Sequence, residues 1–335
     1  MKIGTVDLNE EVLVVAEIGN NHEGDLQLAK RLIGLAAEAG AGAVKFQTIV
    51  PERLVSAAET ERLAQLRRFA FSRDDHEQLA EVAEGHGVIF LSTPFSIDVV
   101  DWLDPLVPAY KVASGDNDFS PLLERIAATG KPIIVSTGMS DQVGVERSVE
   151  QLRGWWSAAG AAPGLALLHC VSSYPTTPEN ANLAAMNVLK RLADVIGYSD
   201  HTLGIDVAVA SVAAGARIVE KHFTISKTHS SFRDHALSAT PEELAELVAR
   251  IRQIDSMLGS GVKRVAECEE QTARAARRSI VAARDLDTGH VVALSDLDWL
   301  RPGDGLSPRS TGELLGRTLI RPVSRGEQMT LEMVD

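Results

Sequence analysis

The first 260 residues alternate eight short, apolar runs rich in β-branched residues with longer helical patterns rich in Ala, Leu and Glu. This alternation constrains the fold most, because it is typical of parallel strands joined by helices. Eight strand–helix units predict an α/β chain folded as a (β/α)8 TIM barrel, with a last helix starting at Pro241. The runs are residues 12–19, 43–48, 87–95, 109–115, 132–139, 165–175, 195–200 and 217–224.

The polar residues of these runs favour the barrel independently. Nearly every run is apolar where it starts and polar where it ends, so the polar side chains should gather at the carboxyl ends of the strands, where barrel enzymes hold their active sites. A doubly wound open sheet is the alternative, but EIGNNHEGD after the first run is not a GxGxxG phosphate loop. The polar positions are Glu17, Lys45, Gln47, Thr93, Lys111, Ser114, Ser136, His201, Glu220 and His222.

Composition excludes several classes of protein. The net charge of −13 and pI near 5.2 argue against nucleic-acid binding, which needs a basic face. No apolar run approaches the roughly 18 to 20 residues of a membrane span, and the first residues lack the pattern of a signal peptide. The two cysteines have no disulfide or metal-finger spacing, so we expect a soluble, cytoplasmic protein.

The chain divides into three parts by composition. Residues 1–260 form the predicted barrel, 261–278 a charged, helix-forming linker, and 279–335 a small domain with short β-like runs and Gly/Pro turns. A domain of fewer than about 60 residues is only marginally stable alone. We therefore expect the small domain to pack against the barrel or a partner subunit.

Two histidines follow the last two predicted strands. His201 and His222 are far apart in sequence, but these strands are neighbours in a closed barrel, about 4.8 Å apart. Both imidazoles could then hold one cation, with Glu220 on the same side of its strand as His222. Two histidines alone are a weak metal signal, and hydrogen-bonded structural roles are the alternative.

Two lysines stand inside otherwise apolar strands, Lys45 in VKFQ and Lys111 in YKVAS. Burying an unpaired ammonium is costly, so these side chains favour a role in ligand binding over a surface position above a strand end. Together with the hydroxyls of Thr93, Ser114, Ser136 and Ser199 they supply the charge-assisted donors that a phosphate and a carboxylate require.

Eight short segments of the chain resemble segments of the N-acetylneuraminate (sialic acid) synthase family and its relatives that make other nonulosonic acids, and they occur in the family's order. The terminal residues, with LRPGDGLSP, are similar to the family's antifreeze-like (SAF), β-clip-like domain. The resemblance covers practically the whole chain. The segments are EIGNNHEGD, AVKFQT, FLSTPFS, YKVASGD, IVSTGMS, CVSSYPT, GYSDHT and EKHFT.

The resemblance implies an enzyme, a C–C bond-forming transferase that condenses phosphoenolpyruvate (PEP) with an amino-sugar aldose such as N-acetylmannosamine. The product is a sialic-acid-like 2-keto-3-deoxy acid, and phosphate leaves by C–O cleavage. It also implies a divalent metal held by His201 and His222, usually Mn²⁺, with Mg²⁺ or Co²⁺ as alternatives. Arg301 would reach across a domain-swapped homodimer to the sugar's acyl group.

The same resemblance assigns the remaining site residues. Asp116 would position or deprotonate the attacking water, and Glu17 and Asp234 would accept hydrogen bonds from the sugar. The implied catalytic residues are Glu17, Asp116, Glu220 and Asp234, and the implied PEP-binding residues are Lys45, Gln47, Thr93, Lys111, Ser114, Ser136, Tyr174 and Ser199.

The chain departs from the family pattern at three places. Asp116 stands where most bacterial relatives have Glu, which bears on the water geometry, although some members also carry Asp. Ser172 stands where some members have Asn, a difference that changes little. The usual PGPDH is replaced by SSFRDH, which keeps Asp234 and His235 but introduces Phe232 and Arg233. Arg233 indicates either an anionic or strongly polar acceptor or a salt bridge.

Several questions stay open from the sequence. The acceptor is N-acetylmannosamine, its 6-phosphate, a diacetamido-trideoxyhexose or an unusual aldose of specialised metabolism. A metal-dependent aldolase or sugar isomerase is the main alternative function, and PEP-dependent phosphate release separates the two. A catalytically silent regulatory or carbohydrate-binding relative is a further alternative, which the retained histidines, lysines and Arg301 disfavour.

Overall fold

The structure is a computed structural model that describes residues 1–335 and divides them into two compact units, Met1–Gly259 and Ser260–Asp335. The first unit contains eight parallel strands in the order β5-β4-β3-β10-β9-β8-β7-β6, with β5 and β6 in contact at the two ends of this order. The predicted TIM barrel is confirmed as a nearly closed barrel. The strands are β3 (Leu13–Gly19), β4 (Ala43–Thr48), β5 (Ile89–Pro94), β6 (Tyr110–Val112), β7 (Ile133–Ser136), β8 (Leu165–Cys170), β9 (Val195–Asp200) and β10 (Ile218–His222).

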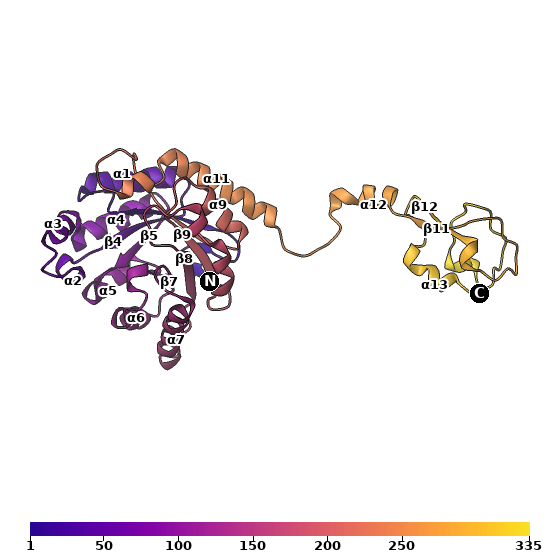
Figure 1. Cartoon of the computed structure of the whole chain (residues 1–335), viewed down its shortest axis with the longest axis horizontal. Coiled ribbons are helices and arrows are strands. Elements are labelled where there is room, and N and C mark those ends of the chain that lie inside the picture. The colour runs from indigo at the N-terminus through magenta and orange to yellow at the C-terminus, as the bar shows by residue number, and fades with distance from the viewer. The chain divides into compact units, whose positions relative to one another are not determined.

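Helices surround these strands (Figure 1). The outer helices are α1 (Leu26–Glu38), α4 (Arg73–Gly85), α5 (Val100–Leu103), α6 (Ser120–Ala127), α7 (Gln142–Ala158), α8 (Met186–Leu189), α9 (Asp206–Ala213) and α11 (Pro241–Leu258). Three further short helices lie in loops after strands: α2 (Pro51–Leu54), α3 (Thr60–Phe69) and α10 (Asp234–Leu237). None of the helices is both long and apolar enough to span a membrane.

Local sequence sets where the main helices begin. The Asp25 side chain accepts hydrogen bonds from the backbone of Gln27 and Leu28 at the start of α1. Thr240 and Glu243 form a capping box at the start of α11, with Pro241 at its first position. These caps satisfy backbone N–H groups that have no partner inside a helix.

The first unit has two apolar layers, because successive residues of a strand point to opposite faces. One layer fills the space between the strands and the helices, and includes Val14, Ala16, Val44 and Phe46. The other fills the inside of the barrel, and includes Leu13, Val15, Ala43, Leu91, Ala109, Ile134, Ala166, Leu168, Val195 and Ile218.

A short hairpin that the sequence patterns do not indicate precedes the barrel. Strands β1 (Lys2–Ile3) and β2 (Val6–Asp7) pair antiparallel, and Ile3 and Leu8 are buried against the interior layer. Because Leu13 starts β3, the hairpin closes the end of the barrel where the strands begin. The opposite end, at the carboxyl ends of the strands, is called the barrel mouth below.

The second unit has its own small core. Strands β11 (Ser279–Ala282) and β12 (Leu297–Leu300) pair antiparallel, and the helices are α12 (Glu270–Ala276) and α13 (Thr311–Leu314). Asp296 is buried there and accepts hydrogen bonds from His290 and Arg284, and these bonds help to lower its pKa to about 2. The core residues include Ile280, Leu286, Val292, Leu314, Leu319, Val323 and Met329.

Candidate active site

The barrel interior changes from apolar to polar toward its mouth. On each strand the side chain two positions after an apolar interior residue points the same way, because strand side chains alternate with a period of two. Val15 is thus followed by Glu17, Ala43 by Lys45 and Leu168 by Cys170. The residues of this polar layer, all buried, are Glu17, Lys45, Thr93, Lys111, Ser136, Cys170, Ser199 and Glu220.

One interior position needs a glycine. A Cβ on Gly197 of β9 would collide with the carbonyl of Ile218 and with a methyl group of Leu168. Only a residue without a side chain lets β9 and β10 approach at this level, directly below Ser199 and Glu220.

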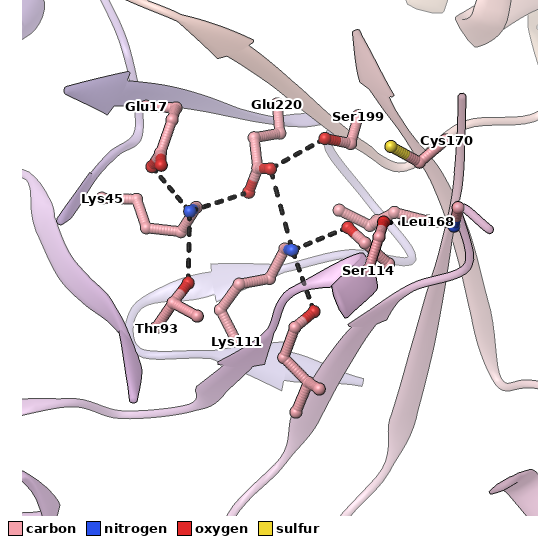
Figure 2. A network of polar contacts seen from close by, with 12 residues as sticks. Glu17, Lys45, Thr93, Lys111, Ser114, Leu168, Cys170, Ser199 and Glu220 are labelled. Carbon is pink, nitrogen blue, oxygen red and sulfur yellow. Dashed lines mark hydrogen bonds and ion pairs between the residues drawn. The ribbon is translucent and has the colours of Figure 1, made fainter. Parts of the chain in front are cut away.

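Lys45 lies at the centre of one half of the layer (Figure 2). Its Nζ is 2.6 Å from Glu17 Oε2, 3.3 Å from Thr93 Oγ1 and 3.8 Å from Glu220 Oε2. Gln47 donates to the other oxygen of Glu17 at 3.1 Å. Burial lowers the pKa of Lys45, but the charges of Glu17 and Glu220 outweigh it, so the pKa is raised and the ammonium persists.

Lys111 lies at the centre of the other half. Its Nζ donates to Ser136 Oγ at 2.6 Å and is 3.7 Å from Glu220 Oε1, which accepts from Ser199 Oγ at 2.9 Å. Figure 2 shows Glu220 between the two lysines. Burial raises the pKa of Glu220, but Lys111 and Lys45 outweigh it, so the net pKa falls and the carboxylate is ionised. Burial lowers the pKa of Lys111, and the neighbouring Glu220 carboxylate opposes that shift. The layer thus holds two lysines joined by one carboxylate.

The two histidines come together at the mouth. The ring centroids of His201 and His222 are 5.5 Å apart. His201 Nδ1 is 2.9 Å from the carbonyl oxygen of Val171. When Nδ1 donates its hydrogen to this oxygen, Nε2 carries the lone pair and can bind a metal. Burial and the charge of His201 hold the pKa of His222 well below its ordinary value, which keeps that imidazole neutral.

An unpaired buried atom tests whether this pair suits a metal. His222 Nδ1 is buried without a hydrogen-bond partner, which is costly unless something binds the imidazole. Imidazole nitrogens are suitable ligands for a divalent transition metal. No set of three or more His, Cys, Asp or Glu side chains in the chain could hold a metal ion. A cation bound by these two residues would therefore complete its coordination with water or substrate.

Tyr174 covers the imidazoles. Its ring centroid is 4.2 Å from that of His201 and 6.0 Å from that of His222, and the side chain is partly exposed. Arg233 stacks on Tyr174, with Cζ 5.1 Å from the ring centroid. The Nε of Arg233 donates to Asp234 Oδ1 at 3.2 Å.

A cradle of hydroxyls lies beside β7. Ser114 Oγ accepts from the backbone N–H of Gly138 at 3.1 Å, and Ser172 Oγ is buried without a partner. A Cβ on Gly138 would collide with both hydroxyls, so a glycine is required there. Cys170 and Ser172 also line a cavity of about 500 Å³ that reaches the start of α7. Both hydroxyls can donate to an anion at this position.

Asp116 has the properties of a general base. It lies in the short turn after β6, and its Oδ2 is buried without a hydrogen-bond partner. Burial and, secondarily, the charge of Asp118 raise the pKa of Asp116 to about 6. A carboxylate with such a pKa can accept a proton near neutral pH.

The structure brings two groups of predicted site residues together. One is the polar network of Glu17, Lys45, Gln47, Thr93, Lys111, Ser136, Ser199 and Glu220. The other is His201, His222 and Tyr174, whereas the Asp116 side chain makes no hydrogen bond or ion pair with either group. Arg301 is exposed in the second unit, and its role in sugar binding stays a prediction. Sequence patterns missed two residues. Asn20 donates to Gln47 Oε1 at 2.8 Å, and Cys170 Sγ lies 3.6 Å from His201 Nδ1. The alternation Ala166, Leu168, Cys170 could have placed Cys170 in the interior.

Comparisons with known proteins identify relatives along the whole chain. The model of the NeuB family matches residues 32–263, and that of the SAF domain matches residues 277–335. The chain is 37% identical to the N,N'-diacetyllegionaminic acid synthase of Legionella pneumophila over 337 residues, covering 96% of this chain and 94% of that protein. It is 33% identical to the human N-acetylneuraminate-9-phosphate synthase over 339 residues, covering 96% and 92%.

A solved structure agrees with this similarity. The crystal structure of the N-acetylneuraminic acid (sialic acid) synthetase of Leptospira borgpetersenii, in complex with citrate, superposes with a TM-score of 0.76 at 34% identity. It covers 81% of this chain and 94% of the other.

Proposed function

This chain belongs to the NeuB family, and from that premise we propose that it condenses PEP with an amino-sugar aldose to give a nonulosonic 2-keto-3-deoxy acid. Water is the third reactant, and inorganic phosphate is the second product. One observation carries the proposal: two buried lysines, Lys45 and Lys111, lie in the barrel interior below the paired imidazoles of His201 and His222. Relatives named as legionaminic acid and N-acetylneuraminate-9-phosphate synthases support the product class.

The polar layer suits the two anionic groups of PEP. Lys45 and Lys111 supply charge, and Thr93 of β5, Ser136 of β7 and Ser199 of β9 supply hydroxyls. The free hydroxyls of Ser114 and Ser172 add donors, and Gln47 and Tyr174 complete the pocket. Glu17 and Glu220 offset the charges of the two lysines in the structure, so PEP would have to compete with these carboxylates for the lysine donors.

The condensation then follows from the chemistry of an enol phosphate. C3 of PEP attacks the aldehyde carbon, and positive charge develops at C2. A divalent cation held by His201 and His222 would polarise the aldehyde carbonyl as a Lewis acid. Glu17 and Asp234 accept hydrogen bonds from the sugar, and Glu220 lies where its carboxylate stabilises the charge at C2.

Water adds at C2 to complete the reaction. Asp116 takes a proton from this water, which its pKa of about 6 allows at neutral pH. The tetrahedral intermediate then collapses, the C–O bond to phosphate breaks, and the keto group forms at C2. Mass and charge balance as PEP, aldose and water give the keto acid and phosphate.

We also propose Mn²⁺ as the metal, with Mg²⁺ or Co²⁺ as alternatives, and a cytoplasmic, domain-swapped homodimer. The free thiols of Cys170 and Cys268 fit a reducing compartment. In such a dimer Arg301 of one subunit completes the acceptor site of the other. Arg301→Ala then raises the KM for the sugar at least tenfold and leaves the KM for PEP unchanged; equal changes in both refute the cross-subunit role.

The decisive experiment measures phosphate release with Mn²⁺, PEP and a panel of aldoses, with mass spectrometry of the product. We expect release only when both PEP and an aldose are present, and a product with the mass of the keto acid. Lys111→Met abolishes release, whereas Lys190→Met, at an exposed lysine, does not. Turnover of an aldose without PEP would instead identify an aldolase or isomerase.

A further inference from the structure

We propose that Arg233 is a specificity residue that binds an anionic substituent, a phosphate monoester or a carboxylate, on the aldose acceptor. This inference rests on the function proposed above and names the substrate class of the same site. The sequence left two interpretations of Arg233 open, an acceptor contact or a salt bridge. The contacts around the residue separate them.

Phe232 fixes the loop that carries Arg233. Its ring packs edge-on against Phe69 of α3, with centroids 5.2 Å apart, and lies 6.0 Å from the buried ring of His235. Neither contact is with the two histidines or the polar layer, so we interpret Phe232 as an anchor of the loop. It holds the backbone of its neighbour in place at the barrel mouth.

Arg233 is stacked on Tyr174, the ring that covers the predicted metal ligands. Its guanidinium lies 5.1 Å from the Tyr174 ring centroid, and that ring lies 4.2 Å from the ring of His201. Stacking on an aromatic face restricts a guanidinium that is otherwise free to move. The cation is therefore held above the place where the sugar carbonyl has to reach.

The salt bridge leaves most of the guanidinium unused. Nε of Arg233 bonds to Asp234 Oδ1 at 3.2 Å, but its two terminal nitrogens make no hydrogen bond, and the side chain is 71% exposed. Two parallel N–H donors on one planar edge match the oxygens of a phosphate or carboxylate. A pure salt bridge would not need to keep this edge free.

Neighbouring cations at the mouth differ from Arg233. Arg68 is 3.5 Å from Glu23, and Lys227 is 2.6 Å from Glu243; neither stacks on a ring next to the histidines. Lys45 and Lys111 are buried in the polar layer, which is the proposed PEP pocket. Of these cations, Arg233 alone combines free terminal donors with a place on the ring that covers the two histidines.

The test compares acceptors that share one sugar ring and differ in the substituent at C6, which is neutral or anionic. We would measure kcat/KM for N-acetylmannosamine, its 6-phosphate and the corresponding 6-carboxylate (uronic acid) with saturating PEP and Mn²⁺. The wild type should prefer at least one anionic acceptor over the neutral one by tenfold or more. The two anionic acceptors distinguish phosphate from carboxylate recognition.

Arg233→Leu should lower this preference at least tenfold through the KM of the anionic acceptor. The KM for PEP and the turnover of the neutral acceptor should change less than twofold. Arg233→Lys keeps the positive charge but lacks the two parallel N–H donors of the guanidinium, so it should retain only part of the preference. Arg53→Leu, at a similarly exposed arginine on α2, is the matched control and should leave the preference unchanged.

Two results would overturn the inference alone: a wild type that turns over neutral aldoses at least as well as anionic ones, or an Arg233→Leu variant that weakens both classes equally. Either result leaves the proposed function standing, because PEP-dependent phosphate release is still observed. Absence of release with every acceptor would overturn the function and the inference together.

Discussion

A buried ion pair lies directly behind the two histidines of the site. Lys221 Nζ donates to Asp200 Oδ2 at 2.7 Å and to the carbonyl of Thr202 at 2.6 Å, and both charged side chains are essentially inaccessible. Lys221 precedes His222, and Asp200 precedes His201. The pair therefore ties together the two strand ends that carry the imidazoles, and we predict that Lys221→Met destabilises the barrel strongly.

The magnitude follows from the geometry. Two unit charges at 2.7 Å attract by about 6 kcal/mol at an effective dielectric constant of about 20. Loss of the lysine leaves Asp200 buried with only the Thr202 backbone and hydroxyl as donors, at 3.0 and 2.8 Å. Breaking one side of a buried pair costs about 3 to 5 kcal/mol, a large fraction of a typical stability of about 5 to 15 kcal/mol.

A second variant tests whether the unpaired Asp200 carboxylate causes the loss of stability. Asp200→Asn combined with Lys221→Met keeps an oxygen for Thr202 but removes the unpaired carboxylate. We expect the double variant to recover at least about 2 kcal/mol of the loss. Without that recovery, lost packing rather than an uncompensated charge would explain the single variant.

Urea unfolding followed by tryptophan fluorescence and circular dichroism measures both free energies at neutral pH. Mn²⁺ titration by calorimetry adds a functional reading, because a loosened β9–β10 edge should bind the ion more weakly in the single than in the double variant. A loss below about 1 kcal/mol in Lys221→Met would refute the reasoning, since the pair would then contribute no more than a surface ion pair.

Three further predictions concern single residues. His222→Ala should abolish turnover and Mn²⁺ binding by calorimetry while circular dichroism stays unchanged; full activity after verified metal depletion would contradict the metal assignment. Because Asp116 must be ionised to accept a proton, kcat/KM should fall as the pH drops through about 6. Asp116→Asn should lose this fall at acidic pH and slow turnover by about 10² to 10⁴, whereas Asp116→Glu should stay active. Burial lowers the pKa of His22 from 6.5 to about 3, so its contribution to stability is present above pH 6.5 and is lost as the pH falls toward 3. The free energy of unfolding, measured with urea, should therefore fall by about 2 kcal/mol between pH 8 and pH 5 because of His22. In His22→Phe the difference between the two pH values should be smaller by that amount; an unchanged difference would exclude His22 as its source.

The strand positions could be predicted because their signal is local. Each barrel strand lies within a predicted apolar run, and the polar layer follows from alternation along single strands. The β1–β2 hairpin could not be predicted, since two-residue strands such as Lys2–Ile3 carry no periodic pattern. Their pairing depends on burial of Ile3 and Leu8 against the closed barrel. The predicted run 109–115 was too long, because the chain turns after Val112 into the bend that carries Asp116.

Local patterns along the chain were sufficient to predict the eight-stranded barrel, the resemblance to a family, and the strand ends that bear Lys45, Lys111, Glu220, His201 and His222. The folded structure was needed to learn that Glu220 of β10 bridges lysines of β4 and β6, strands that are not its neighbours. It also shows that Phe232 anchors a loop while Arg233 stacks at the mouth. Periodicity is a property of neighbouring residues and is visible along the chain. Distances across a barrel depend on how the whole sheet closes, which no local pattern specifies.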